Sequence, residues 1–174
     1  MVLFAAFGIR VSIRGPAFYC PQRAGLGGRP FTLFKLRTMH VNHGTNVSVV
    51  TGANDSRVFA FGSLLRRLKI DELPQLWNIL RGDMSIVGPR PEDLKIVSQH
   101  YGDIGMSTLA VRPGLAGVSS IYNYTHGERM LTGPDPEQIY ASELLPVKLA
   151  LEAVYLERRS MTYDLVMILR TVTA

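Results

Sequence analysis

Glycine and proline interrupt this chain so often that its sequence favours short elements over long uninterrupted ones. Sixteen glycines and ten prolines are spread over 174 residues. The sequence therefore predicts many turns and short elements and argues against a long-helix bundle. Helical spacing is the commonest pattern between the breaks, and no βαβ alternation indicates a doubly wound sheet. We expect an α+β fold that is mostly helical, with a small β-hairpin.

Length and composition fit one folded domain. The chain is 47% hydrophobic and 19% charged, and it has no internal repeat or low-complexity segment. We therefore expect a single domain over residues 1–174. The one cysteine, Cys20, excludes an internal disulfide, and we expect it to lie half-buried in a strand.

The net charge of +5 favours anionic partners but does not separate nucleic acid from phospholipid headgroups or nucleotide-sugars. The cations lie in short clusters, and no block of five or six like charges forms a basic tail. The sequence contains no helix-turn-helix pattern, zinc-ligand spacing or aromatic RNA-binding strand. We expect no nucleic-acid partner.

The N-terminal segment Met1–Ile9 is apolar and is followed by Arg10 and Arg14. It is shorter than the roughly 20 residues that cross a bilayer, and it lacks the basic start and cleavage site of a signal peptide. Two interpretations remain open. The segment is either a buried first element or the end of a longer membrane-embedded helix.

Two strand-like stretches, 17–22 and 30–37, flank a glycine-containing loop at 23–28, which predicts the hairpin. Alternation places Lys35 and Arg37 on one strand face, where they form either a phosphate clamp or a solvated surface. Residues 40–56 are polar and predict a loop. His40 and His43 in it could bind a metal, but no third ligand is near, so a solvated loop is the favoured interpretation.

Apolar spacing predicts helices over 57–69, 92–100, 138–159 and 162–173, with loops at 112–114 and 127–137. Another helix is expected to begin at Asp71, with Pro74 in its first turn, and to end at Gly82. In the last helix five apolar residues share one broad face, which packs in the core or lies on a membrane surface. These are Leu165, Val166, Ile168, Leu169 and Val172.

Asp71 and Glu72 are the candidate chemical centre. They open a predicted helix, whose free N–H groups attract anions, and they follow Arg66, Arg67 and Lys69. Two carboxylates beside a diphosphate would need Mg²⁺, which binds one or two carboxylates together with phosphate oxygens. One acid could then attack phosphorus while the other holds the metal. The alternative is an ordinary helix cap. Nearby, prolines on both sides of Arg90 restrict its backbone, which suits an arginine that grips phosphate.

The run from Lys69 to Pro91 (KIDELPQLWNILRGDMSIVGPRP) resembles the bacterial sugar transferases, the monotopic phosphoglycosyl transferases. Further stretches resemble that family in the same order, so the resemblance covers nearly the whole chain. They are GPAFYCPQR at 15–23, GRPFTLFKLRTM at 28–39, NDSR at 54–57, RPGLAG at 112–117 and Tyr155 with SMTYDLVMILRT at 160–171.

The resemblance implies a two-step reaction in which the residue matching Asp71 attacks the sugar-bearing phosphate of a UDP-sugar and releases UMP. A polyprenyl phosphate then takes the phospho-sugar from the enzyme, which initiates cell-surface polysaccharide or glycoconjugate synthesis. Glu72 is implied as the Mg²⁺ ligand, and Arg90 as part of the phosphate- or nucleotide-binding motif. The other implied basic positions are Lys35, Arg37, Arg66, Arg67 and Arg112.

Family members usually begin with a re-entrant membrane helix that turns back at a Ser-Pro break, and no Ser-Pro precedes Gly15. Residues 1–14 are expected to be the remnant of that element, and attachment to the cytoplasmic face of the bacterial inner membrane is the implied location. The alternatives are a non-enzymatic peripheral lipid-binding protein and a truncated, inactive homologue. The sequence settles neither the sugar nor the pathway, and a homodimer is one possible assembly.

Overall fold

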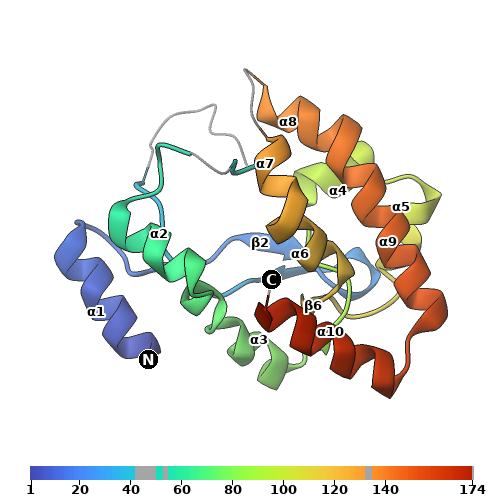
Figure 1. Cartoon of the computed structure of the whole chain (residues 1–174), viewed down its shortest axis with the longest axis horizontal. Helices are drawn as coiled ribbons and strands as arrows, with labels where there is room; N and C mark the ends of the chain where they lie inside the picture. The colour runs from blue at the N-terminus through green and yellow to red at the C-terminus, as the bar shows by residue number, and fades with distance from the viewer. Residues whose placement is uncertain (42–49, 53–54, 132–134, 174) are drawn as a thin grey trace.

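The structure, a computed structural model, describes residues 1–41, 50–52, 55–131 and 135–173 (Figure 1). Short strand pairs lie between two N-terminal helices, at the left of Figure 1, and a group of C-terminal helices at the right. Helices predominate, so the α+β, mostly helical prediction is confirmed. Most of the predicted loop at 40–56 lies outside the described residues, and His43 lies there too.

The predicted hairpin is present as two short antiparallel ladders. β1 (Phe18–Tyr19) pairs with β4 (Lys35–Leu36), and β2 (Gln22–Ala24) pairs with β3 (Pro30–Thr32). The turn between β2 and β3 contains the 3₁₀ turn η1 (Leu26–Gly28), where Gly27 and Gly28 have positive φ angles. Cys20 lies between β1 and β2 and is exposed, so the prediction of a half-buried strand residue is wrong.

A third strand pair was not predicted. β5 (Ser85–Val87) lies parallel to β6 (Gly114–Ala116), and the connection between them holds α4 (Leu94–His100) and α5 (Asp103–Thr108). The sequence predicted a loop at 112–114, but the strand begins at Gly114. The two backbones approach so closely at that glycine that a Cβ on it would lie 2.1 Å from the backbone nitrogen of Gly88.

The N-terminal helices pack on the first strands. α1 (Val2–Ser12) buries Ala5 and Ile9, and α2 (Ala60–Arg67) buries Leu65 in the same apolar cluster. α2 is shorter than the predicted helix 57–69, since Arg57 lies in a turn where it pairs with Asp55. The 3₁₀ turn η2 (Ile70–Glu72) and α3 (Gln75–Arg81) follow, and Gly82 ends α3 with φ of 80° as predicted.

The C-terminal half is more helical than predicted. The expected loop 127–137 contains α7 (Glu128–Met130) and the start of α8 (Pro136–Ile139), and the expected helix 138–159 is divided into three parts. Those parts are the end of α8, a π-helical turn η4 (Tyr140–Leu144) and α9 (Leu145–Arg158). Ahead of them lie α6 (Val118–Tyr122) and a second π-helical turn, η3 (Asn123–Gly127), and α10 (Met161–Thr173) closes the chain.

Two further apolar clusters hold this half together. One joins α4 to the α8–α9 region through Ile96, Tyr140 and Leu149. The other packs Met167 of α10 against Tyr155 of α9 and Val87 of β5. Within α10, Leu165, Val166 and Leu169 are exposed, so the predicted apolar stripe packs in the core only in part.

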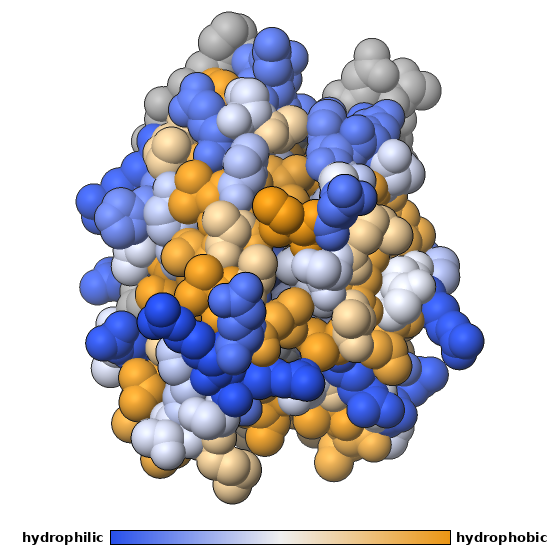
Figure 2. All heavy atoms as spheres, turned by 90° about the vertical axis from the view of Figure 1, so that its right-hand side faces the viewer, coloured by the Kyte–Doolittle hydropathy of each residue, from blue (hydrophilic) through white to orange (hydrophobic). Residues whose placement is uncertain are grey.

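Exposed apolar side chains gather on three helices that lie at the lower end of Figure 1, namely α1, α3 and α10. Phe4 of α1 is 83% exposed and Leu80 of α3 is 78% exposed. In the side view of Figure 2, apolar residues likewise reach the lower end of the molecule, below a row of hydrophilic side chains. Within the described residues no helix combines the length and apolar character needed to span a bilayer.

Candidate active site

Asp71 and Glu72 lie in a tight turn between α2 and α3. Lys69, with φ of 55°, adopts a left-handed conformation that ends α2, and the 3₁₀ turn η2 follows at once. The predicted helix start at Asp71 is therefore wrong by a few residues, because regular α-helix begins only after Pro74. Both acids are buried, with 2% and 7% exposure, although ionised carboxylates are seldom buried without partners.

Lys35 lies within ion-pair distance of both acids. β4 places its Nζ 2.9 Å from Oδ2 of Asp71 and 3.6 Å from Oε1 of Glu72. The strand supplies this residue from a distant part of the chain, since β4 packs beside η2. The predicted basic residue Lys35 therefore does lie at the two acids.

Arg90 approaches Glu72 from the other direction. Its Nη2 donates to Oε1 of Glu72 at 2.7 Å, and its Nη1 donates to the hydroxyls of Ser120 and Tyr124 at 3.3 and 3.2 Å. Burial raises the pKa of Glu72, but the charges of Arg90 and Lys35 and two hydrogen bonds outweigh it and lower this pKa to about 2. Glu72 is therefore an anion at neutral pH.

Tyr124 is a site residue that sequence reasoning missed. Its hydroxyl donates to Oε2 of Glu72 at 2.8 Å, and Lys69 Nζ lies 4.3 Å from the centre of its ring. Burial raises the pKa of Tyr124, so its hydroxyl keeps the proton that it donates. The residue lies in η3, and π-helical turns often occur at functional sites. No local pattern marks such a turn, so only the fold brings Tyr124 to Glu72, 52 residues away.

The arrangement is an anionic pair surrounded by donors. The adjacent carboxylates of Asp71 and Glu72 could hold a divalent cation together with phosphate oxygens, since Mg²⁺ needs only one or two carboxylates. No cluster of three or more metal-binding side chains occurs in the described residues, so substrate oxygens and water would complete such a shell. His40, for which the sequence favoured a solvated loop over a metal site, is exposed and packs edge-on against Phe59.

Arg37 is not brought to the two acids. β4 ends at Leu36, and the buried Arg37 side chain donates from Nη2 to the carbonyl of Arg14 at 2.9 Å. A Cβ on Gly15 would lie 2.6 Å from its Nη1, so the guanidinium packs against the end of the N-terminal segment. The structure supports neither alternative for this pair: Arg37 is buried away from the acids, so it forms no phosphate clamp with Lys35 and does not lie on a solvated face.

The two arginines of α2 also point elsewhere. Arg66 donates from Nε to the hydroxyl of Thr38 at 3.2 Å, and Arg67 is exposed. Among the described residues neither forms an ion pair with Asp71 or Glu72. Lys69, which follows them, donates from Nζ to the backbone carbonyl of Thr171 in the last turn of α10.

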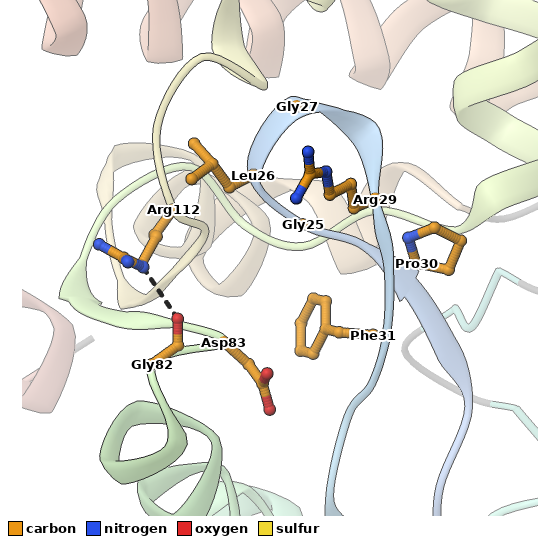
Figure 3. A pocket seen from close by; sticks show the side chains of 9 residues that line it. All are labelled: Gly25, Leu26, Gly27, Arg29, Pro30, Phe31, Gly82, Asp83 and Arg112. Carbon is orange, nitrogen blue, oxygen red and sulfur yellow. Dashed lines mark hydrogen bonds between the residues drawn. The ribbon is translucent and has the colours of Figure 1, made fainter.

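Arg112 lines a separate cavity of about 460 Å³, shown in Figure 3. Its Nε donates to the carbonyl of Gly82 at 2.8 Å, so it lies beside the C-terminal end of α3, whereas the two acids precede the other end of that helix. Neither acid lines this cavity. The lining residues are Gly25, Leu26, Gly27, Arg29, Pro30, Phe31, Gly82, Asp83 and Arg112.

The family comparison matches the entire chain. The model of the family described as "Bacterial sugar transferase" covers residues 1–174. A UDP-glucose:undecaprenyl-phosphate glucose-1-phosphate transferase of Caulobacter vibrioides is 36% identical over 174 residues, which cover 99% of this chain and 61% of the relative. A protein of the same description from Xanthomonas campestris is 43% identical over 129 residues, covering 71% of this chain and 26% of the relative.

A UDP-N-acetylgalactosamine-undecaprenyl-phosphate N-acetylgalactosaminephosphotransferase of Aeromonas hydrophila is 31% identical over 176 residues, covering 99% of this chain and 38% of the relative. The chain thus matches between about a quarter and three fifths of the length of these three relatives. The match over all 174 residues agrees with the resemblance carried by the Lys69–Pro91 run. The chain belongs to the bacterial sugar transferase family.

Proposed function

We propose that this chain transfers a sugar-1-phosphate from a UDP-sugar to a polyprenyl phosphate. Relatives described as transferases between UDP-sugars and undecaprenyl phosphate support the reaction class. The observation that carries the proposal is the buried pair Asp71 and Glu72, held between Lys35 and Arg90. We further propose, as the family resemblance implies, that this transfer initiates cell-surface polysaccharide or glycoconjugate synthesis.

Asp71 is the proposed nucleophile. One of its carboxylate oxygens bonds to the sugar-bearing phosphorus while the bond from that phosphorus to the bridging oxygen breaks, and UMP leaves with the electron pair. An oxygen of the polyprenyl phosphate then bonds to the same phosphorus, and the aspartate oxygen leaves as carboxylate. Lys35, 2.9 Å from Asp71, supports this role because its ammonium group holds the carboxylate in position.

The remaining cations suit the charge that develops on phosphate. Lys35 and Arg90 now neutralise the carboxylates, and the same donors could turn to phosphate oxygens when a diphosphate enters. Mg²⁺ held by Glu72 would supply the further positive charge that two carboxylates and a diphosphate require. Tyr124 would orient the Glu72 carboxylate toward that ion through its hydroxyl.

The test is Mg²⁺-dependent UMP release from a panel of UDP-sugars, together with intact-mass detection of a phospho-sugar adduct. Because the amide of Asp71→Asn is a far poorer nucleophile, we expect this variant to lose UMP release by at least about 1,000-fold and to form no adduct. Asp103→Asn on the surface helix α5 is the matched control. If Asp71→Asn releases UMP at the wild-type rate, the nucleophile is another group.

We further propose that the exposed apolar side chains of α1, α3 and α10 contact a membrane surface, with the cytoplasmic leaflet as the expected side. Each of these helices also carries an arginine in its last turn: Arg10, Arg81 and Arg170. Apolar side chains next to cations suit a surface of anionic lipid. Such contact would bring a polyprenyl phosphate, whose tail stays in the lipid, to the enzyme.

Vesicle sedimentation tests this contact. We expect the chain to bind vesicles containing phosphatidylglycerol more strongly than neutral phosphatidylcholine vesicles. We also expect Leu80→Glu to reduce binding several-fold, because it puts a charge in place of methyl groups that the lipid would cover. Met106→Glu on α5, where an apolar residue is also exposed, is the matched control. Equal binding by both variants would place the membrane contact elsewhere.

A further inference from the structure

The segment Pro89-Arg90-Pro91 has only one backbone N–H group, because neither proline carries one. That single donor, the N–H of Arg90, is bound at 3.0 Å by Oε1 of Glu152 in α9, a residue 62 positions later in the chain. Glu152 is 2% exposed and plays no part in the chemistry proposed above. Burying a carboxylate costs free energy unless the group is paired, so the position of Glu152 beside this segment requires an explanation.

A pair of serines links the same glutamate to the other end of Arg90. Ser119 donates from its hydroxyl to Oε1 of Glu152, and the adjacent Ser120 accepts from the Arg90 guanidinium at 3.3 Å. Arg90 is thus held at its backbone by Glu152 and near its charged end by Ser120. Both serines are fully buried at the start of α6.

A second contact from α9 holds the residue that follows the prolines. Lys148, one turn before Glu152, donates from Nζ to Oε2 of Glu92 at 3.0 Å, and the Tyr140 hydroxyl donates to the same oxygen. Lys148 is buried and lies 4.7 Å from the centre of the Tyr140 ring. Helix α9 therefore fixes the segment at residue 90 and again at residue 92.

We propose that Glu152 is a positioning residue which, by binding the Arg90 N–H, sets the point from which the guanidinium reaches Glu72 and an incoming phosphate. The inference rests on the proposed function, since it assigns Glu152 a role in that same site. A positioning role makes one specific prediction: the rate of UMP release should depend more on where the side-chain oxygen of residue 152 lies than on its charge. A shift of about 1 Å at a site of this kind can cost roughly 100-fold in rate.

Two substitutions of Glu152 separate the effect of side-chain length from that of side-chain charge. Glu152→Gln keeps the chain length and an oxygen acceptor but removes the charge, so we expect kcat/KM for UMP release to stay within about threefold of wild type. Glu152→Asp keeps the charge but withdraws the oxygens by one methylene, and we expect a loss of about tenfold or more. Glu157→Asp, on the exposed side of α9, is the matched control. The opposite ranking of Gln and Asp would overturn the proposal.

A double-mutant cycle tests whether Glu152 acts through Arg90. In an Arg90→Ala background, Glu152→Asp should cost less than about threefold, because the group that it positions is already gone. Full additivity of the two losses would show that Glu152 affects activity by another route. Thermal unfolding of every variant checks that the losses do not arise from unfolded protein.

Amide hydrogen exchange at Arg90 supplies a readout that does not require turnover. We expect exchange at this amide to be at least about tenfold faster in Glu152→Asp and nearly unchanged in Glu152→Gln. If wild type releases no UMP, the proposed function fails while the exchange result still decides whether Glu152 holds Arg90. If wild type is active and Arg90 exchanges equally in all variants, the positioning role fails alone.

Discussion

Glu72 and Glu152 bind opposite ends of Arg90, the guanidinium and the backbone N–H, and differ in what compensates their burial. Glu72, in front, faces the cations Arg90 and Lys35 and the hydroxyl of Tyr124, and these lower its pKa to about 2 in spite of burial. Glu152, behind, has its pKa raised by burial, and Lys148, the Ser119 hydroxyl and the Arg90 N–H offset only part of that effect. One glutamate is thus prepared as an anion for chemistry, and the other serves as a hydrogen-bond acceptor.

Arg90→Ala is expected to have the largest effect, because this substitution removes the guanidinium that binds Glu72 from a residue that also contacts Glu152. We expect a loss of about 100-fold in kcat/KM for UMP release, with a higher KM for the UDP-sugar, since a charged donor to phosphate is removed. Arg90→Lys should recover only part of the loss, because an ammonium cannot reach Glu72, Tyr124 and Ser120 together. An unchanged KM in Arg90→Ala would refute a role in nucleotide-sugar binding.

Lys35→Ala leaves Glu72 with one facing cation, as Glu152 has, and also removes the cation beside Asp71. We expect a loss of about 30-fold in kcat, because one positive charge near the developing phosphate charge is lost. Lys95→Ala, on the exposed side of α4, serves as the control. A loss confined to KM would mean that Lys35 binds substrate but does not act on the transition state.

Tyr124→Phe removes the hydroxyl donor from Glu72 and keeps the ring under Lys69. One hydrogen bond to a charged group contributes at least about 1.5 kcal/mol, so we expect kcat/KM to decrease by about tenfold or more, with a higher Mg²⁺ concentration needed for half-maximal activity. Tyr122→Phe is the neighbouring control. Equal activity of Tyr124→Phe and wild type would show that Arg90 and Lys35 orient Glu72 without the hydroxyl.

The smallest effect concerns stability as a function of pH, measured as melting temperatures of Glu72→Gln and Glu152→Gln against wild type. The pKa of Glu72 is lowered on folding, so its stabilising contribution is present above about pH 4.5 and declines toward pH 2. The pKa of Glu152 is raised, so its contribution is largest in acid and declines as the pH rises through the raised pKa. If the difference in melting temperature from wild type changed with pH in the same direction for both variants, the contrast between Glu72 and Glu152 would be wrong.

The sequence predicted the acids and the cations that pair with them, but it did not predict the residues that hold Glu72 and Arg90 in position. Asp71, Glu72 and Arg90 lie within one motif of about twenty residues, and Lys35 follows from the charge pattern of a strand. Arg37 shows the limit of such a pattern, because the alternation holds only while the strand continues. No local spacing indicates the other site residues, because each contacts a partner 30 to 62 positions away in the sequence. These residues are Tyr124, Ser120 and Glu152.

The fold was predictable to a similar extent. Glycine and apolar spacing indicated the hairpin, α2 and the end of α3 at Gly82. The parallel pair of β5 and β6 was missed because each strand has three residues, too few for a periodic signal, and because close backbone contact at Gly114 is invisible without the partner strand. Both π-helical turns were missed since each lies within an otherwise helical pattern.

The hydrogen bond from Lys69 to the Thr171 carbonyl joins the residue before the acidic turn to the final helical turn of the chain. Trimming α10 ahead of Thr171 would remove that acceptor and leave an ammonium group beside Tyr124 and Glu72 with no carbonyl to bind. Affinity tags and fusion partners are therefore better attached away from this end, and any loss of activity after shortening α10 should be checked against Lys69→Met before it is attributed to poor folding.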